Sequence, residues 1–241
     1  MKTDRSHNSF RTGWRPTIGA TTLLGLAAVV VYLAPWGNLS LEFSRRTIAG
    51  GEIWRLLTCH WTHFSFEHFV WNLLPFVWLG ALCERRDRQG FLLCTIGSAL
   101  AISVYVFLFV PELSSYRGLS GLDSALFGFI AVGRVNDAVK ARNRMKCLLL
   151  GLCASLFAAK IGYETVCRAP LFVSHVEAGF VPVPGAHAVG FLVGATTVLL
   201  SEIKNRIQSV ATGSGSVNSV SLGRVRPAHT HSSPAARSTA L

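Results

Sequence analysis

A serine lies between two glycines in the middle of the chain, and a histidine follows it much later. Ser120 stands between Gly118 and Gly121 in "YRGLSGLDSALFGFIAVGR", and His187 lies in the late segment "GAHAVGFLVG". A hydroxyl is a weak nucleophile by itself, and an imidazole can take its proton near neutral pH. The two side chains therefore supply the nucleophile and the general base that a serine hydrolase needs.

A second polar group precedes these residues in the segment "HFSFEHFVWN". His68 and Asn72 are four residues apart, so on a helix they share a face and point at one place. A tetrahedral intermediate needs hydrogen-bond donors in a dry site, and these two side chains and the backbone N–H of Ser120 are candidates for that oxyanion hole. His63 is expected to support them as a hydrogen-bonding residue.

Ser120 also has a simpler explanation. With Asp123 it fits the pattern S-x-x-D, a capping box at the start of a helix. A serine that caps a helix can be a nucleophile as well, so the sequence leaves both roles open.

Small residues at helical spacing predict close contact between the segments that carry Ser120 and His187. Such residues let helix backbones approach each other in a membrane. They are Gly121, Ala125 and Gly128 in the first segment and Gly190 and Gly194 in the second. The contact would draw the serine and the histidine together, and Gly118 and Gly121 would also let the backbone approach a substrate carbonyl.

The elements that carry these groups have the composition of membrane spans. Of 241 residues, 50% are apolar and only 15% are charged, which predicts an all-α polytopic membrane protein. A bilayer is crossed by about 20 apolar residues, and six such runs occur. They cover about 18–36, 66–83, 91–110, 119–135, 147–167 and 185–202.

The basic residues predict how these spans are oriented. The net charge of +11 comes from short clusters between apolar runs, which favours membrane orientation over nucleic-acid binding. Placing the N-terminus inside puts most lysines and arginines on the cytoplasmic side. Ser120, His187, His68 and Asn72 then all lie near the outer face. The connection Gly37–Ser65 is apolar enough to lie in the interface, with Trp54, Trp61 and Arg55 as anchors.

Three parts follow from this division. Residues 1–17 form a cytoplasmic N-terminal segment, and residues 18–207 form the membrane domain. Residues 208–241 are rich in Ser, Gly, Ala and Thr with little aliphatic periodicity, and they are expected to form a disordered cytoplasmic tail.

These motifs together resemble the rhomboid intramembrane serine proteases. The family's GxSG is found at Gly118–Gly121, and its HxxxxHxxxN corresponds to His63, His68 and Asn72. Its late histidine followed by small residues corresponds to His187, Gly190 and Gly194, and its WR pair corresponds to Trp54 and Arg55. The resemblance implies a six-helix bundle and a dyad of Ser120 and His187 without a third carboxylate. It also implies cleavage of transmembrane protein substrates within the bilayer.

One position departs from the family pattern. Many rhomboids have a tyrosine four residues after the nucleophile, packed against the catalytic histidine, and this chain has Ser124. Either another group holds His187, or the activity is low and specialised. The rhombosortases, a shorter branch, resemble this chain in the "YRGLSG" segment and in Lys160 and Glu164 of the fifth span. That pair is expected to be buried and mutually neutralising.

Other classes of protein stay open or are disfavoured. A rhomboid-like protein that binds transmembrane helices without cutting them is the main alternative, because Ser124 leaves His187 unclamped. A small-solute transporter is weaker, since no paired half-repeats occur. No HExxH is present, and neither a metal nor another cofactor is expected. A bacterial cytoplasmic membrane is the simplest location, while the substrate and the oligomeric state are not encoded in any motif.

Overall fold

The computed structural model describes residues 19–34, 36–169, 171 and 182–215. The chain divides into two compact units. The first ends at Glu202, and the second begins at Ile203. The predicted N-terminal segment 1–17 lies outside the described residues, as does the predicted tail from residue 216 onward. Residues 208–215, which the sequence predicts to be part of that tail, are helical instead.

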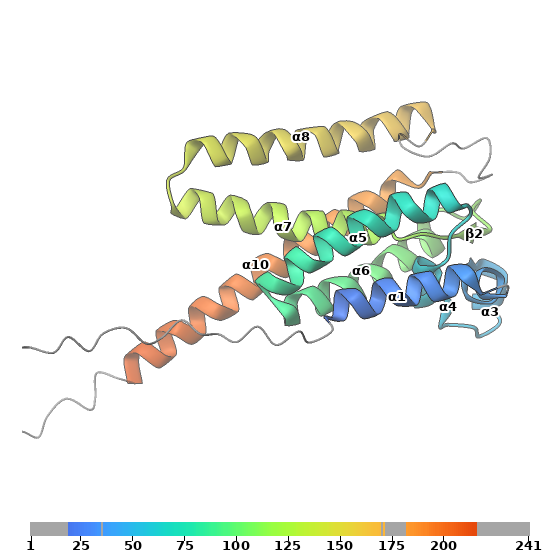
Figure 1. Cartoon of the computed structure of the whole chain (residues 1–241), viewed down its shortest axis with the longest axis horizontal. Helices are drawn as coiled ribbons and strands as arrows, with labels where there is room; N and C mark the ends of the chain where they lie inside the picture. The colour runs from blue at the N-terminus through green and yellow to red at the C-terminus, as the bar shows by residue number, and fades with distance from the viewer. Residues whose placement is uncertain (1–18, 35, 170, 172–181, 216–241) are drawn as a thin grey trace, which may run out of the picture. The chain divides into compact units, whose positions relative to one another are not determined.

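The described chain is built almost entirely from helices (Figure 1). A short antiparallel strand pair joins Phe43 to Tyr116 and Ser44 to Ser115. In chain order the elements are α1 (Ala20–Leu33), α2 (Gly37–Leu41), β1 (Phe43–Ser44), α3 (Arg45–Ala49), α4 (Arg55–Thr58), a 3₁₀ turn (Cys59–Trp61), α5 (Phe66–Arg86), α6 (Arg88–Phe109), β2 (Ser115–Tyr116), α7 (Ser120–Lys140), α8 (Arg144–Cys167) and α10 (Pro184–Gly215).

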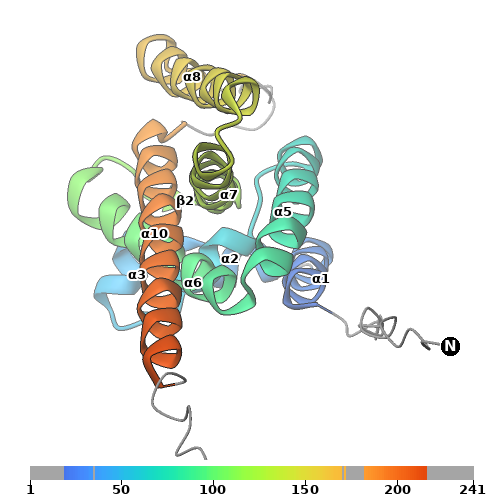
Figure 2. The ribbon, with the colours of Figure 1, turned by 90° about the vertical axis from the view of Figure 1, so that its left-hand side faces the viewer.

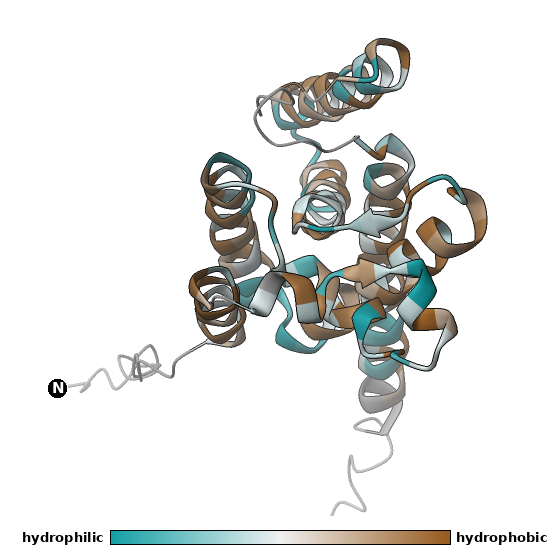
Figure 3. Ribbon diagram, turned by 90° about the vertical axis from the view of Figure 1, so that its right-hand side faces the viewer, coloured by the Kyte–Doolittle hydropathy of each residue, from teal (hydrophilic) through white to brown (hydrophobic). Residues whose placement is uncertain are grey.

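Four of the described helices are long and apolar enough to cross a membrane, namely α5, α6, α8 and α10. The fold is therefore all-α and polytopic, as the sequence predicts. Large apolar side chains lie exposed on these helices, and the hydropathy colouring shows apolar residues along them (Figure 3). Such an exposed apolar surface suits lipid contact.

The other two predicted spans have different properties. α1 has 14 described residues, about 21 Å of helix. α7 has 21 residues, enough for a span, and it carries Asp123, Arg134, Asp137 and Lys140. It lies at the centre of the helices in Figure 2 and contacts α5, α6 and α8. Because neighbouring helices shield it, α7 does not need the apolar surface that lipid would demand.

The predicted small-residue contact between α7 and α10 is confirmed. A Cβ added to Gly190 would collide with the backbone carbonyl of Gly121, and one added to Gly194 would collide with the carbonyl of Ala125. A Cβ on Gly128 would lie 2.5 Å from the carbonyl oxygen of Phe191. The two helices therefore touch through backbone atoms along three successive turns.

Polar side chains fix the opposite ends of the helices. Glu84, near the end of α5, accepts hydrogen bonds from the backbone N–H groups of Ala20 and Thr21 at 2.7 and 2.9 Å, and so caps the start of α1. Arg86 pairs with Asp137 of α7 at 2.7 Å and with Glu202 of α10 at 2.8 Å. These contacts hold the start of α1, the ends of α5 and α7 and the middle of α10, far from Ser120 along α7.

We predict that Gly194→Leu destabilises the protein, because the side chain would have to displace the backbone of α7. The expected loss is about 3 kcal/mol or more, measured as unfolding in mixed detergent micelles. Gly151→Leu is the matched control, since a Cβ at Gly151 of α8 meets nothing within 4 Å. Equal stability of the two variants would contradict the close contact.

Candidate active site

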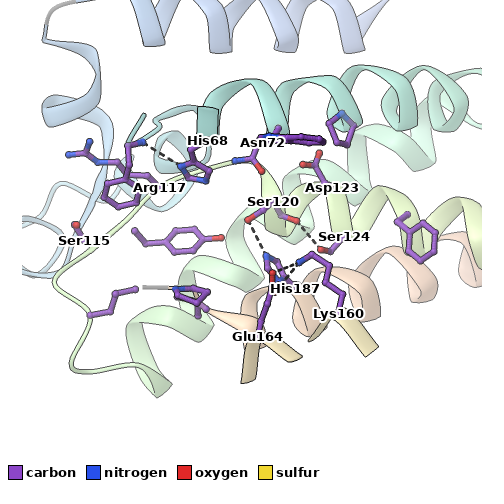
Figure 4. A pocket seen from close by; sticks show the side chains of 18 of the residues that line it. His68, Asn72, Ser115, Arg117, Ser120, Asp123, Ser124, Lys160, Glu164 and His187 are labelled. Carbon is purple, nitrogen blue, oxygen red and sulfur yellow. Dashed lines mark hydrogen bonds and ion pairs between the residues drawn. The ribbon is translucent and has the colours of Figure 1, made fainter. Parts of the chain in front are cut away.

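The candidate nucleophile and base meet at the first turns of two helices. Ser120 is the first residue of α7, and His187 lies in the first turn of α10, which begins at Pro184. Nε2 of His187 lies 3.1 Å from Oγ of Ser120, a hydrogen-bond distance (Figure 4). His187 is buried and Ser120 is partly exposed. The pair thus has the contact that proton transfer from serine to histidine requires.

The capping explanation for Ser120 is wrong. The N-cap residue of α7 is Leu119, and no side chain caps the helix. Ser120 Oγ contacts His187 instead of a helix N–H group. Ser124, one turn later, donates its hydroxyl proton to the carbonyl of Ser120 at 2.8 Å. Ser124 therefore holds the backbone of the nucleophile, and its hydroxyl is directed there rather than at His187.

The candidate oxyanion donors lie on the other side of Ser120. Ser65 caps α5 by accepting a hydrogen bond from the backbone N–H of His68 at 3.1 Å. Nδ1 of His68 accepts a hydrogen bond from the N–H of Phe64 at 3.4 Å, which leaves the proton on Nε2. Nδ2 of Asn72 is buried and finds no acceptor among the described residues. A buried donor without a protein acceptor is costly, so Nδ2 of Asn72 is available to an acceptor that enters the site.

Gly118 holds these donors near the nucleophile. Its φ of +112° favours glycine, and a Cβ there would lie 2.8 Å from Nε2 of His68 and 3.2 Å from Nδ2 of Asn72. The backbone before Ser120 can therefore lie directly against both side chains. This is the structural reason for the first glycine of the motif.

The connection between α1 and α5 braces the segment that leads to Ser120. Its strand β1 pairs with β2, and the carbonyl of Cys59 accepts a hydrogen bond from the N–H of Gly118 at 3.3 Å. Arg117 pairs with Glu42 at 2.6 Å and lies over the ring of Phe64 at 4.8 Å. The strand pair, the backbone hydrogen bond and the two contacts of Arg117 thus fix the approach to the nucleophile.

Two arginines stabilise this connection from within. Arg55, expected as an interfacial anchor, is buried, and it donates to the carbonyls of Leu39 and Glu42 at 3.0 and 2.9 Å. Arg45 donates to the carbonyls of Val106, Phe107 and Val110 and so satisfies the end of α6. Trp54 is half exposed, as an anchor would be.

Two buried histidines lie beside the site and stay neutral. His63 packs edge-on against His68 with ring centroids 5.2 Å apart. Burial, together with the neighbouring His68, lowers the pKa of His63 to about 3. Burial lowers the pKa of His60 to about 4, and its Nε2 lies 3.0 Å from the carbonyl oxygen of Ala99. Both rings support the loop, and His63 supports His68 directly.

Glu164 is the site residue whose position the sequence did not predict. Lys160 and Glu164 form the expected ion pair at 2.8 Å on α8. Oε2 of Glu164 also lies 3.1 Å from Nδ1 of His187, although the ring N–H does not point directly at that oxygen. The resemblance implies a dyad without a third carboxylate, and in this chain a carboxylate lies next to the ring of the candidate base. A carboxylate inside an apolar run, at the same end of the bundle as Ser120, was the available signal.

A cavity of about 490 Å³ connects these groups. Its lining includes Ser120, His187 and other polar residues. It also includes apolar residues of three helices. These are Trp71, Pro75 and Leu79 of α5, Phe127 of α7 and Phe157 of α8. A bound peptide with one polar and one apolar stretch would match this lining.

Comparisons with known proteins identify the family of the chain. A family model described as "Rhomboid domain" matches residues 50–202. The chain is 36% identical over 114 residues to proteins named "Rhomboid protease GlpG" from Salmonella choleraesuis (strain SC-B67) and Salmonella newport (strain SL254). Each match covers 46% of this chain and 37% of the relative, little more than a third of its length. The chain belongs to the rhomboid family and is an integral membrane protein.

We predict that His60 makes the folded protein less stable in acid. The unfolded side chain has a pKa near 6.5 and the folded one about 4, so the unfolded state binds more protons between these values. The free energy of unfolding then falls as the pH is lowered from 6.5 towards 4. In His60→Gln the slope of this fall should be smaller by up to about 1.4 kcal/mol per pH unit. Identical slopes in detergent unfolding would contradict the prediction.

Proposed function

We propose that the protein is an intramembrane serine endopeptidase that cleaves peptide bonds in or next to transmembrane segments. The observation that carries the proposal is the 3.1 Å contact between Ser120 Oγ and His187 Nε2 in a cavity lined by both polar and apolar residues. The rhomboid relatives that carry the name protease support it.

Ser120 attacks a backbone carbonyl of the substrate while His187 Nε2 takes the hydroxyl proton. The resulting oxyanion is stabilised by Asn72 Nδ2, His68 Nε2 and the backbone N–H of Ser120. His187 then gives its proton to the leaving amine, and an acyl-enzyme remains on Ser120. Water, activated by the same histidine, releases the second product and restores the serine.

The substrate enters from the bilayer past the apolar residues that line the cavity. Trp71 and Pro75 of α5 are among these residues, and so is Phe157 of α8. A transmembrane segment presents an apolar surface of this kind, and its less helical end would reach Ser120. The partners are therefore membrane proteins and the lipid bilayer.

The proposal includes the orientation and the extent of the domain. Residues 18–207 form a six-span domain in which α1 and α7 also cross the membrane. The N-terminus faces the cytoplasm, and Ser120 and His187 face the outer, periplasmic side of a bacterial cytoplasmic membrane. The clusters of arginine and lysine at the opposite helix ends support this orientation.

A protein that binds transmembrane helices without cutting them is the second candidate. The observation that favours it is Ser124, which replaces the aromatic residue that many rhomboids place against the histidine. A fluorophosphonate probe separates the two functions, because it reacts only with an activated serine. Labelling at Ser120 supports the protease, and no labelling of well-folded protein supports the binder.

We predict that Ser120→Ala and His187→Ala abolish cleavage of a tagged transmembrane substrate co-expressed with the protein. Both variants remove a reacting group while leaving the apolar helix surfaces unchanged, so membrane insertion should persist. Cleavage is read by gel, and insertion is read by membrane fractionation. Cleavage that survives Ser120→Ala would overturn the assignment.

We predict that Asn72→Ala lowers kcat by about 10²–10³-fold, because the oxyanion loses one donor. Asn136→Ala is the control, since Asn136 donates to Glu202 at 3.2 Å at the opposite end of α7. The KM of both variants should stay near that of wild type. Equal loss of kcat in both would show that the effect is not local to the oxyanion.

A further inference from the structure

Resting on the proposed function, we propose that Glu164 is a positioning residue that completes a serine–histidine–glutamate triad. Its Oε2 lies 3.1 Å from Nδ1 of His187, while Nε2 of the same ring lies 3.1 Å from Oγ of Ser120. The three groups form a continuous line from carboxylate to ring to hydroxyl, which can be followed in Figure 4. The lysine next to them, Lys160, holds the carboxylate.

The burial of Glu164 separates it from an ordinary surface ion pair. Of the residues of α8, all of which the structure describes, Glu164 alone is buried. Its side chain is 3% exposed, whereas apolar residues such as Leu148 and Leu156 are more than half exposed. α8 exposes most of its leucines and buries one carboxylate, and burying a carboxylate costs desolvation free energy. Such a group inside a membrane domain is rare and usually faces a cavity or a partner, which makes it a candidate for a functional role.

Lys160 fixes the carboxylate in place. Its Nζ lies 2.8 Å from Oε1 and 2.9 Å from Oε2 of Glu164, so the side chain contacts both oxygens. The backbone N–H of Leu171 donates to Oε1 at 3.4 Å. With Oε1 held in this way, Oε2 is the oxygen that reaches His187.

The carboxylate of Glu164 holds the ring of His187, which Ser124 does not do. With the ring proton on Nδ1, the nitrogen that lies 3.1 Å from Glu164, the lone pair on Nε2 faces Ser120. When Nε2 takes the serine proton, the ring becomes an imidazolium next to the carboxylate, which stabilises it and stays ionised. No proton moves to Glu164. The ring and the oxygen are imperfectly aligned at rest, and such contacts commonly tighten when substrate binds.

Other charged or titratable groups line the same cavity as the ring and must be considered in any pH test. They are Lys160 of α8, Asp123 of α7, His68 of α5, and Glu112, Tyr116 and Arg117 of the segment before α7. Glu164 and Lys160 have opposite charges on the same helix. Removing each charge in turn should therefore move the acid limb of the pH profile in opposite directions. A pair with a merely structural role would not do this.

The test is the rate of fluorophosphonate labelling of Ser120 in purified full-length protein as a function of pH. Glu164→Gln should lower the rate constant by about 10²–10⁴-fold and move the acid limb of the profile to lower pH, because the imidazolium loses its counter-charge. Lys160→Met should move the acid limb to higher pH. Glu164→Asp should recover part of the lost rate.

Glu202→Gln is the matched control, since Glu202 is also a paired, little-exposed carboxylate but lies with Arg86 away from the site. Its labelling rate and pH profile should equal those of wild type. If Glu164→Gln is too unstable to assay, Lys160→Met carries the test, and an unchanged acid limb overturns the triad.

The two proposals fail in different ways. Wild-type protein that labels at Ser120, with Glu164→Gln labelling at the same rate and pH, overturns the triad and keeps the protease. Wild-type protein that does not label at any pH overturns the protease itself.

Discussion

The close contact between α7 and α10 is the constraint on which the site depends. A lipid environment offers helices little hydrophobic drive to associate, so backbone packing has to supply it. Gly190 against the carbonyl of Gly121 and Gly194 against that of Ala125 let the two helices touch along their first turns. Ser120 and His187 begin these same helices, and their contact follows from the helix contact. A larger residue at either glycine would separate the pair before it changed any polar group.

A second constraint acts from the connection between α1 and α5. It pairs β1 with β2, and it joins Arg117 to Glu42 and Cys59 to Gly118. A helix start has no earlier turn to hold it, and Ser120 is the first residue of α7. The connection takes the place of that missing turn. It also brings His68 and Asn72 against Gly118, so the donors and the nucleophile are positioned by one piece of structure.

Much of this arrangement could be predicted from the sequence. The four-residue spacing of His68 and Asn72, the glycine spacing and the order of the motifs are local patterns, and the structure retains them. Glu164 could not be placed in the same way, because its partner lies on another helix. Its spacing of four residues from Lys160 already explains the carboxylate as half of an ion pair on one helix. That explanation gives no reason to expect a contact with His187. The rotation of α8 about its axis decides that contact, and no periodicity in the sequence specifies it.

The most direct measurement of the central claim is an experimental structure of the protein with a fluorophosphonate bound. The account predicts a covalent bond to Ser120 Oγ and a phosphonyl oxygen about 3 Å from Nδ2 of Asn72 and Nε2 of His68. It also predicts that Nδ1 of His187 is aligned with Glu164. An adduct on another residue, or an oxygen directed away from Asn72, would contradict it.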